Sequence, residues 1–294
     1  MRLLAVPNWS FGRDRRLLAD CKDALTALGL DVHYCDSQVD QNRTVTAFSG
    51  QHDLVGQGLF TLSEMILPGI DLNRHVGVHP RIGGLDVCPF IALEPPKTKL
   101  RAQKLREWVE GVASQFATQY ETPVFLYEKS ERGRHESDLP SLRRGGFGGL
   151  LERTLDPDFG PHSAHPRLGA TVIGWREFLV TINVNLANVD ADPAKRIAQR
   201  IRELRSDGDT RMLGVRALGF PLASRDLSQI SLNLTLPDLT PIDPILSYVT
   251  SVAQAMGSEV AYTELVGVIR DTDLPHATLI APRPEQVVHI GVRV

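Results

Sequence analysis

Apolar and polar positions along the chain follow two spacings, which predict an alternation of strands and helices. Short apolar runs and two-residue alternation predict strands at residues 2–6, 30–35, 43–48, 85–92, 124–127, 178–186, 215–220, 227–236 and 260–269. Three- and four-residue spacing predicts helices at residues 13–28, 53–67, 99–120, 193–204 and 241–256. A last apolar segment covers residues 286–294.

The order of these elements predicts a fold of the α/β (α+β-like) class. A chain of 294 residues exceeds the usual size of one domain, so we expect two subdomains, residues 1–175 and 176–294. Hairpin connections at residues 30–48 and 215–236 interrupt the alternation of strand and helix. Each subdomain is therefore predicted to be a mixed β-sheet with helices on one face, without a repeat of 20 to 50 residues.

The composition of the chain excludes several classes of binding partner and of structural site. Hydrophobic residues make up 42% of the chain, charged residues 23%, and the formal net charge is -3, so electrostatics favour neither nucleic acid nor an anionic membrane. Cys21, Cys35 and Cys88 are few and far apart, which argues against a disulfide framework and a thiolate zinc site. The N-terminus has too short an apolar run for a signal peptide, so we expect a cytoplasmic protein without membrane contact.

One glycine-rich stretch, residues 75–87, concentrates titratable side chains. His75, His79, Arg81 and Asp86 supply a base near neutral pH, a fixed cation and an anion, while three glycines allow close approach to a ligand. This composition suits a reactive loop, and it equally suits a surface turn with solvated histidines. Asp86 can orient the base, or only tie down the loop as the next strand begins.

The same stretch argues against three familiar kinds of site. His75 and His79 have the spacing of helical metal ligands, but Pro80 disfavours a helix and no glutamate follows His75, so we predict no metal. The chain has no nucleophile elbow, phosphate loop or dinucleotide-binding glycine pattern.

Three further segments are irregular. Residues 36–43 form a polar loop, and residues 129–144 are charged and expected on the surface. Residues 147–169 are rich in glycine and proline. They fit a linker between the subdomains, or a ligand-binding loop at their junction.

Several segments resemble the formiminotransferase domain family of glutamate formimidoyltransferases. They are residues 6–10 (VPNWS), Asp36 with residues 42–45 (NRTV), residues 77–90 (GVHPRIGGLDVCPF) and residues 158–161 (DFGP). The second half resembles that family at Gln229, Ser231, Asn233 and Leu234, followed by Thr240 and Pro241. The likeness runs in order over nearly the whole chain.

This resemblance implies a fold, an activity and partners. The fold is two α/β subdomains that meet at a folate-holding cleft, in a homodimer. The activity is transfer of a formimino group from N-formimino-L-glutamate to tetrahydrofolate, a co-substrate, which gives 5-formiminotetrahydrofolate and glutamate in histidine degradation and one-carbon metabolism. The helical cyclodeaminase domain that is fused to the animal relatives is not expected in this sequence.

The resemblance also implies a set of site residues. His79 matches the catalytic histidine of the family, and we predict that Asp36 and Arg81 assist it. The predicted binding residues are Asn42, Arg43, His75 and Asn183, with the folate loop Gly160, Pro161, His162, Ser163, Ala164, His165, Pro166, Arg167, Leu168 and Gly169.

The residues fit this chemistry. One imidazole can take a proton from the attacking pterin nitrogen and give one to the departing amine. Arg43, Arg81 and Arg167 are suited to grip carboxylates. The amides of Asn183, Asn185 and Asn233 can read a pterin edge or only bond to neighbouring backbone. A related formyl or formiminoglycine transferase and a non-catalytic folate-binding protein remain alternatives.

Overall fold

The computed structural model describes residues 1–135 and 139–291, and the chain divides into two compact units. Unit 1 comprises Met1–Arg176 together with Gly291, and unit 2 comprises Glu177–Ile290. Parts of two predicted segments, residues 136–138 and 292–294, lie outside the described residues.

Unit 1 is built on a mixed β-sheet. Its strands, from one edge to the other, are β3 (Asp31–Gln38), β4 (Arg43–Gln51), the pair β1 (Arg2–Ala5) and β2 (Asn8–Trp9), β5 (Leu85–Ala92), β7 (Thr171–Trp175) and β6 (Val124–Leu126). β1 and β2 are antiparallel to both β4 and β5, whereas β5, β7 and β6 run parallel. Pro7 separates β1 from β2, because proline cannot donate to the ladder.

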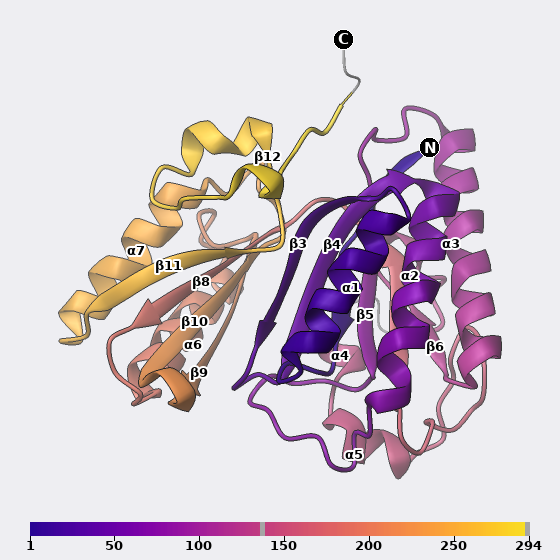
Figure 1. Cartoon of the computed structure of the whole chain (residues 1–294). Coiled ribbons are helices and arrows are strands. Elements are labelled where there is room, and N and C mark those ends of the chain that lie inside the picture. Colours follow the sequence, from indigo (N-terminus) through magenta and orange to yellow (C-terminus); the bar gives the residue numbers. More distant parts are fainter. Residues whose placement is uncertain (136–138, 292–294) are drawn as a thin grey trace. The chain divides into compact units, whose positions relative to one another are not determined.

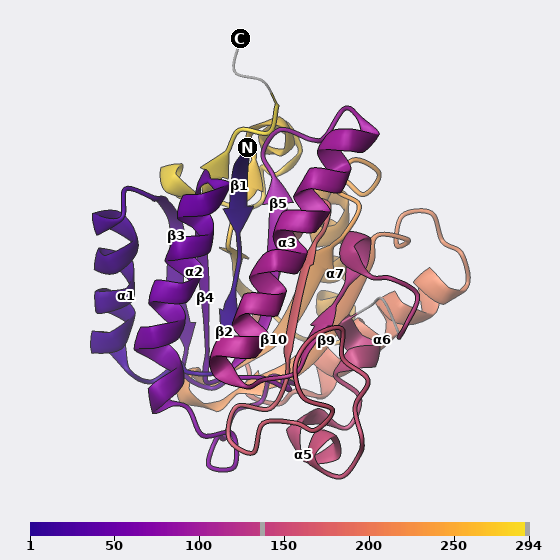
Figure 2. The ribbon, with the colours of Figure 1, turned by 90° about the vertical axis from the view of Figure 1, so that its right-hand side faces the viewer.

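Three long helices cover one face of this sheet, as Figure 2 shows: α1 (Arg15–Ala27), α2 (His52–Ile66) and α3 (Lys99–Tyr120). Asp14 caps α1 and Thr98 caps α3 by accepting backbone N–H groups, and Gly29 turns the chain after α1 with φ +77°. The core between helices and sheet includes Trp9, Phe48, Phe90, Leu59, Leu62, Val109 and Phe116. The predicted mixed sheet is confirmed, and its long helices lie on one face.

The opposite face of the same sheet carries a smaller core. The short helices α4 (Leu139–Leu142) and α5 (Gly146–Leu151) place Leu142 and Leu150 among strand residues that include Val87 and Val172. The prediction that residues 129–144 are an exposed segment is therefore wrong at its C-terminal end. Leu142 is buried, and the side chain of Arg143 is only 13% exposed because it pairs with Asp86.

Unit 2 contains a four-stranded antiparallel sheet in the order β11 (Val260–Val266), β8 (Val180–Leu186), β10 (Leu227–Leu234) and β9 (Val215–Leu222). The helices α6 (Asp192–Ser206) and α7 (Ile242–Ala255) pack on one face, which Figure 1 shows. Apolar residues of β8 and β10, such as Ile182 and Leu232, are fully buried in this core. The predicted last strand ends before residue 269, because Gly267 turns with φ +80°.

Two short parallel strands, β12 (Ile269–Arg270) and β13 (Val287–Val288), follow in unit 2. Between them the chain forms the 3₁₀ turns η4 (Asp271–His276) and η5 (Pro284–Gln286). Three other such turns, η1 (Leu67–Gly69), η2 (Glu128–Ser130) and η3 (Ala223–Arg225), connect elements elsewhere. No helix in residues 1–135 and 139–291 is long and apolar enough to cross a membrane.

Both units contain the same strand–helix arrangement. β1, α1, β3, β4, α2 and β5 in unit 1 correspond to β8, α6, β9, β10, α7 and β11 in unit 2. In each unit the second strand lies at one edge, followed by the third, the first and the fourth. This is the ferredoxin-like βαββαβ motif, which unit 1 extends by α3, β6 and β7.

Close packing of α6 on β9 generates a first prediction. A Cβ added at Gly219 would lie 2.4 Å from the backbone of Ala194 on α6. We expect Gly219→Ala to lower the free energy of unfolding by about 1–3 kcal/mol, because the helix has to move away from the sheet. Urea denaturation followed by circular dichroism measures this change.

Gly111→Ala on α3 is the matched control, since an added Cβ there has no heavy atom within 4 Å. We expect it to raise the free energy of unfolding by roughly 0.5–1 kcal/mol, the usual gain for alanine in a helix. A Gly219→Ala protein as stable as the wild type would contradict the packing described here.

Candidate active site

The loop that holds His79 is bound to the turn between β3 and β4. The amide of Val78 donates to the carbonyl of Asp40 at 3.0 Å, and the Asn42 side-chain amide donates to the carbonyl of Val76 at 3.1 Å. Arg13 also donates to the Val76 carbonyl, at 3.1 Å. The two polar loops singled out in the sequence therefore form one structure within unit 1.

A relay of Arg81, His75 and Asn42 joins these two loops. The Arg81 Nη1 donates to Nδ1 of His75, and Nε2 of His75 lies 2.9 Å from the carbonyl oxygen of Asn42. Since guanidinium only donates and a carbonyl only accepts, His75 is neutral with its proton on Nε2. Burial and the Arg81 charge lower the pKa of His75, in agreement with that state.

Arg81 also holds the loop through its second terminal nitrogen. Nη2 donates to the carbonyl oxygens of Gln41 at 3.1 Å, Gly77 at 3.0 Å and His79 at 2.5 Å. The loop comes so close that a Cβ at Gly77 would lie 2.3 Å from the Gln41 oxygen, so only glycine fits. The contacts of Arg81 thus shape the loop, whereas the sequence suggested a grip on substrate carboxylates.

His79 is half-buried and held in one tautomer. Its Nδ1 lies 2.8 Å from the carbonyl oxygen of Pro80, so Nδ1 carries the proton and Nε2 is the basic nitrogen. Burial, followed by the charges of Arg43 and Arg143, lowers the pKa of His79 well below its usual 6.5. The imidazole is therefore neutral at physiological pH and able to accept a proton.

Arg43 and Arg143 both lie close enough to His79 and Asp86 to interact with them electrostatically. Arg143 pairs with Asp86, whose other oxygen accepts the Ile82 amide at 2.7 Å. Arg43 donates to the side chain of Asn8, and burial beside Arg143 lowers its pKa to about 10. Asp86 thus ties the loop to Arg143.

The buried Nε atoms of Arg43 and Arg143 find no hydrogen-bond partner within residues 1–135 and 139–291. Two guanidinium groups with only one carboxylate nearby leave an excess of positive charge, which is the electrostatic requirement for an anion site. Sequence reasoning missed Arg143, because its position in a charged segment carries no sign of the distant pairing with Asp86.

The second candidate loop, residues 160–169, lies beside the histidine loop in the same unit. The amide of Gly84 donates to the carbonyl of Leu168 at 2.9 Å, and Asn73 Nδ2 donates to the carbonyl of Pro166 at 2.9 Å. Gly83 and Gly169 form a β-bridge where an added Cβ would lie within about 2 Å of backbone oxygen, at 2.1 Å and 2.0 Å. The structure brings these two predicted loops together.

Histidines within residues 160–169 have local structural contacts. Nδ1 of His165 accepts the amides of Arg167 and Leu168, at 3.1 Å and 2.9 Å. Nδ1 of His162 bonds to the Leu155 carbonyl at 2.9 Å. Arg167 is exposed and donates to the Pro68 carbonyl at 3.0 Å. These contacts give the loop a defined shape.

The loop begins at an anchored aspartate. Asp158 accepts the Leu126 amide at 2.7 Å and lies 2.8 Å from Nε2 of His135. Burial alone would raise its pKa, but these hydrogen bonds lower it below the usual 3.8. Gly160 then turns with φ +88° against the Thr122 carbonyl. The DFGP motif, residues 158–161, thus anchors the beginning of the loop.

Two predicted site residues lie elsewhere. Asp36 is exposed on the edge strand β3, where its carboxylate accepts the amide of Ser37 at 2.7 Å. Asn183 lies on β8 in unit 2, and its Nδ2 donates to Glu264 at 3.0 Å. Their roles in the reaction stay predictions.

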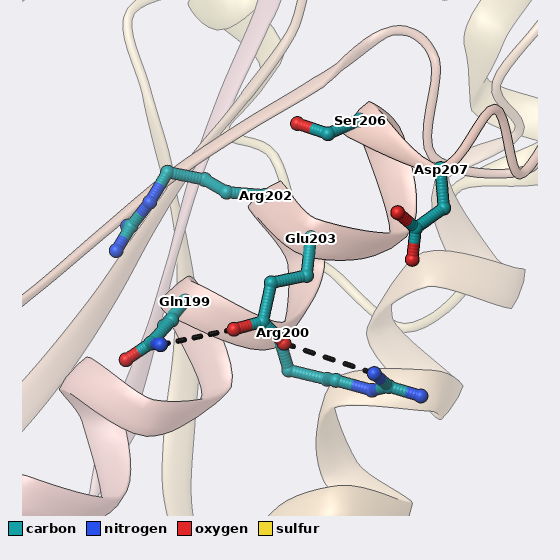
Figure 3. A pocket seen from close by; sticks show the side chains of 6 residues that line it. All are labelled: Gln199, Arg200, Arg202, Glu203, Ser206 and Asp207. Atoms are coloured by element: carbon teal, nitrogen blue, oxygen red, sulfur yellow. Dashed lines mark hydrogen bonds and ion pairs between the residues drawn. The ribbon is translucent and has the colours of Figure 1, made fainter.

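A shallow depression of about 390 Å³ lies on the surface of α6 in unit 2 (Figure 3). Its side chains pair with one another: Gln199 donates to Glu203 at 2.9 Å, and Arg200 lies 3.7 Å from the same carboxylate. These are ordinary pairs along a solvated helix face, so we do not assign the depression to the site. Within residues 1–135 and 139–291, no group of three or more metal-ligating side chains is found.

Comparison with known families identifies the architecture that carries this loop. The family model described as "Formiminotransferase domain, N-terminal subdomain" matches residues 2–176, and the model described as "Formiminotransferase domain" matches residues 181–280. The chain belongs to the formiminotransferase domain family. The resemblance seen in the sequence is therefore confirmed.

Individual proteins from several organisms are similar to this chain over most of its length. The chain is 32% identical to glutamate formimidoyltransferase of Thermoplasma acidophilum, over 92% of this chain and 88% of that protein. It is 30% identical to glutamate formimidoyltransferase of Streptococcus pyogenes serotype M1, over 89% and 87%. Formimidoyltransferase-cyclodeaminase of Sus scrofa is 33% identical over 90% of this chain. The chain spans about half the length (49%) of that two-function relative.

The charges around His79 generate a second prediction. We expect the His79 imidazole to titrate below pH 6.5, because burial disfavours its charged form and protonation adds a charge beside Arg43 and Arg143. Arg143→Gln removes one of these charges, so the pKa of His79 should rise. An NMR titration of labelled histidine side chains measures both values.

Arg144→Gln is the matched control, because Arg144 is the exposed neighbour in the chain. It should leave the pKa of His79 unchanged. A His79 imidazole that titrates at 6.5 or above in the wild type would refute the electrostatic environment described here.

Proposed function

We propose that this protein transfers the formimino group of N-formimino-L-glutamate to tetrahydrofolate, giving 5-formiminotetrahydrofolate and glutamate. The observation that carries the proposal is the state of His79: Nδ1 bonded to the Pro80 carbonyl and a lowered pKa. Such an imidazole is a base at neutral pH. The relatives named glutamate formimidoyltransferase support this choice of reaction.

The chemistry requires one proton to move between two nitrogens. The N5 atom of tetrahydrofolate attacks the amidine carbon of the donor, and a new C–N bond forms as Nε2 of His79 takes the N5 proton. The tetrahedral intermediate then breaks the bond to the glutamate nitrogen, and the imidazolium of His79 returns the proton to this leaving amine. Acid–base catalysis of this kind contributes about 10²–10⁴ in rate.

The positive cluster suits the charge of the substrates. Both substrates end in carboxylates, and the Nε atoms of Arg43 and Arg143 are buried without a partner in the described residues. We assign these two arginines to a substrate carboxylate. This role replaces that of Arg81, whose terminal nitrogens hold the loop.

The remaining assignments rest on the family. The segment Gly160–Gly169 is proposed to bind the folate, and its hydrogen bonds to Asn73 and Gly84 support this by holding it beside the histidine loop. Asp36, Asn42 and His75 are proposed as supporting residues. We further propose a cytoplasmic homodimer, which is what the resemblance to the family implies. Analytical ultracentrifugation would test the dimer.

Replacement of His79 tests the mechanism. Purified protein, given formiminoglutamate and tetrahydrofolate, should form 5-formiminotetrahydrofolate. His79→Ala should lower kcat by about 10²–10⁴, because the proton loses its carrier. His289→Ala is the control, since the His289 side chain is 57% exposed and pairs with Asp271 on the surface. Product formation is followed by absorbance and confirmed by mass spectrometry.

The outcomes separate the alternatives. An active His79→Ala protein would refute the role of His79. Turnover only with a formyl or formiminoglycine donor would replace the proposed donor. Folate binding without turnover of any of these donors would indicate a non-catalytic folate-binding protein.

A further inference from the structure

Residues 132–135, which follow the turn η2, pack against the residues that lead into the segment Gly160–Gly169. Three side chains of this short segment each contact one side chain of residues 156–159. The pairs are Arg132 with the Phe159 ring, Arg134 with Asp156, and His135 with Asp158. Two stretches that are about 20 residues apart in the sequence are therefore joined directly before the candidate loop.

The two charged pairs differ in their exposure to water. The side chains of His135 and Asp158 are 8% and 0% exposed, whereas those of Arg134 and Asp156 are 44% and 62% exposed. An exposed pair contributes little to stability because water and salt screen it. Removal of one partner from a buried pair has a much larger effect, since it leaves an uncompensated charge.

Asp158 depends on His135 for one of its two hydrogen bonds from the described residues. Its Oδ2 accepts the Leu126 amide at 2.7 Å and lies 2.8 Å from Nε2 of His135. Because an ionised carboxylate only accepts, this Nε2 carries the proton. Oδ1 of Asp158 is buried and has no hydrogen-bond partner within the described part of the chain. Without the imidazole, the buried carboxylate would lack a donor that water cannot easily replace.

Packing holds the imidazole in the orientation that this hydrogen bond requires. The rings of His135 and Phe125 meet edge to face, with centroids 5.2 Å apart and planes at 85°. Phe125 lies on β6 and is buried. The ring is thus fixed from a second side, as is typical of a residue that positions another group.

The backbone at Asp158 leads directly into the candidate loop. The amides of Asp158 and Phe159 donate to the Val124 carbonyl at 3.0 Å and 3.2 Å, and the Val124 amide donates to the Phe159 carbonyl at 2.9 Å. Gly160 follows at once with its positive φ of +88°. A shift of Asp158 would therefore displace the first residues of the loop.

We propose that His135 is a positioning residue for tetrahydrofolate, because through Asp158 it holds the segment Gly160–Gly169 in the shape that binds this co-substrate. We assign His135 no part in the proton transfer. The inference rests on the proposed function, which gives that segment to the folate.

Three replacements separate the hydrogen bond from other effects. His135→Leu removes the donor. His135→Gln places an amide nitrogen near the position of Nε2 and restores a donor for Asp158. Arg134→Gln is the matched control, because it breaks only the neighbouring exposed pair with Asp156.

Hydrogen exchange measures the shape of the loop without turnover. The amides of His165 and Gly169 donate to each other's carbonyls, at 2.9 Å and 2.8 Å. We expect both to exchange roughly 10- to 100-fold faster in His135→Leu, because a charge-assisted hydrogen bond near the loop is lost. His135→Gln and Arg134→Gln should exchange at nearly the wild-type rate. Amides of α3 report on global unfolding and should not change.

Steady-state kinetics test the connection to the co-substrate. His135→Leu should raise KM for tetrahydrofolate by roughly 5- to 50-fold and leave KM for formiminoglutamate unchanged, and His135→Gln should restore the wild-type value. A purely structural role would instead lower the active fraction, and with it the apparent kcat, without a change in either KM.

The outcomes distinguish this inference from the proposed function. Wild-type exchange rates at residues 160–169 in His135→Leu would overturn the inference, and so would faster exchange with an unchanged KM for tetrahydrofolate. A wild type without formimino transfer refutes the proposed function, and anaerobic calorimetric titration with tetrahydrofolate then decides whether His135→Leu binds it more weakly. A wild type that does not bind tetrahydrofolate would overturn both.

A second variant guards against a failure to fold. If His135→Leu does not fold, His135→Asn takes its place in both measurements, because its side chain is polar but too short to bring a donor to Asp158. The same exchange rates and the same KM values then decide.

Discussion

The relay from Arg81 through His75 to the Asn42 carbonyl is the contact on which the candidate site depends. It joins the β3–β4 turn to the histidine loop, and Asn42 takes a left-handed backbone conformation, φ 46°, to present that carbonyl. Asparagine tolerates this conformation better than most residues. The other terminal nitrogen of Arg81, Nη2, then donates to the carbonyl of His79 itself.

Arg43 and Arg143 favour the neutral form of His79, but their mutual repulsion destabilises the folded protein. Burial and two nearby guanidinium groups destabilise the charged form of the imidazole, so His79 remains a neutral base at physiological pH. The same repulsion is unfavourable for folding, and Asp86 offsets part of it by pairing with Arg143 and accepting the Ile82 amide. An incoming carboxylate would offset more, which couples anion binding to the electrostatics of the base.

In unit 2, hydrogen bonds between side chains order a polar sheet face. Its polar face has few charges, and one carboxylate, Glu264, orients a short chain of amides. Amides that are fixed in orientation present a defined pattern of donors and acceptors, whereas freely turning amides present none. The shared βαββαβ arrangement therefore carries charged loops in unit 1 and an amide-bearing sheet face in unit 2.

Local patterns in the sequence were sufficient for much of this protein. Apolar spacing predicted the long helices and most strands, the glycines around His79 marked a tight loop, and Pro80 excluded helical geometry for the two histidines. Tertiary structure alone decided the rest. Arg143 meets Asp86 across 57 positions, Arg81 turns to the backbone, and the polarity of Asn183 and Asn185 comes from Glu264 on another strand. Spacing records which way a side chain faces, but a hydrogen bond depends on atoms that only the folded chain brings together.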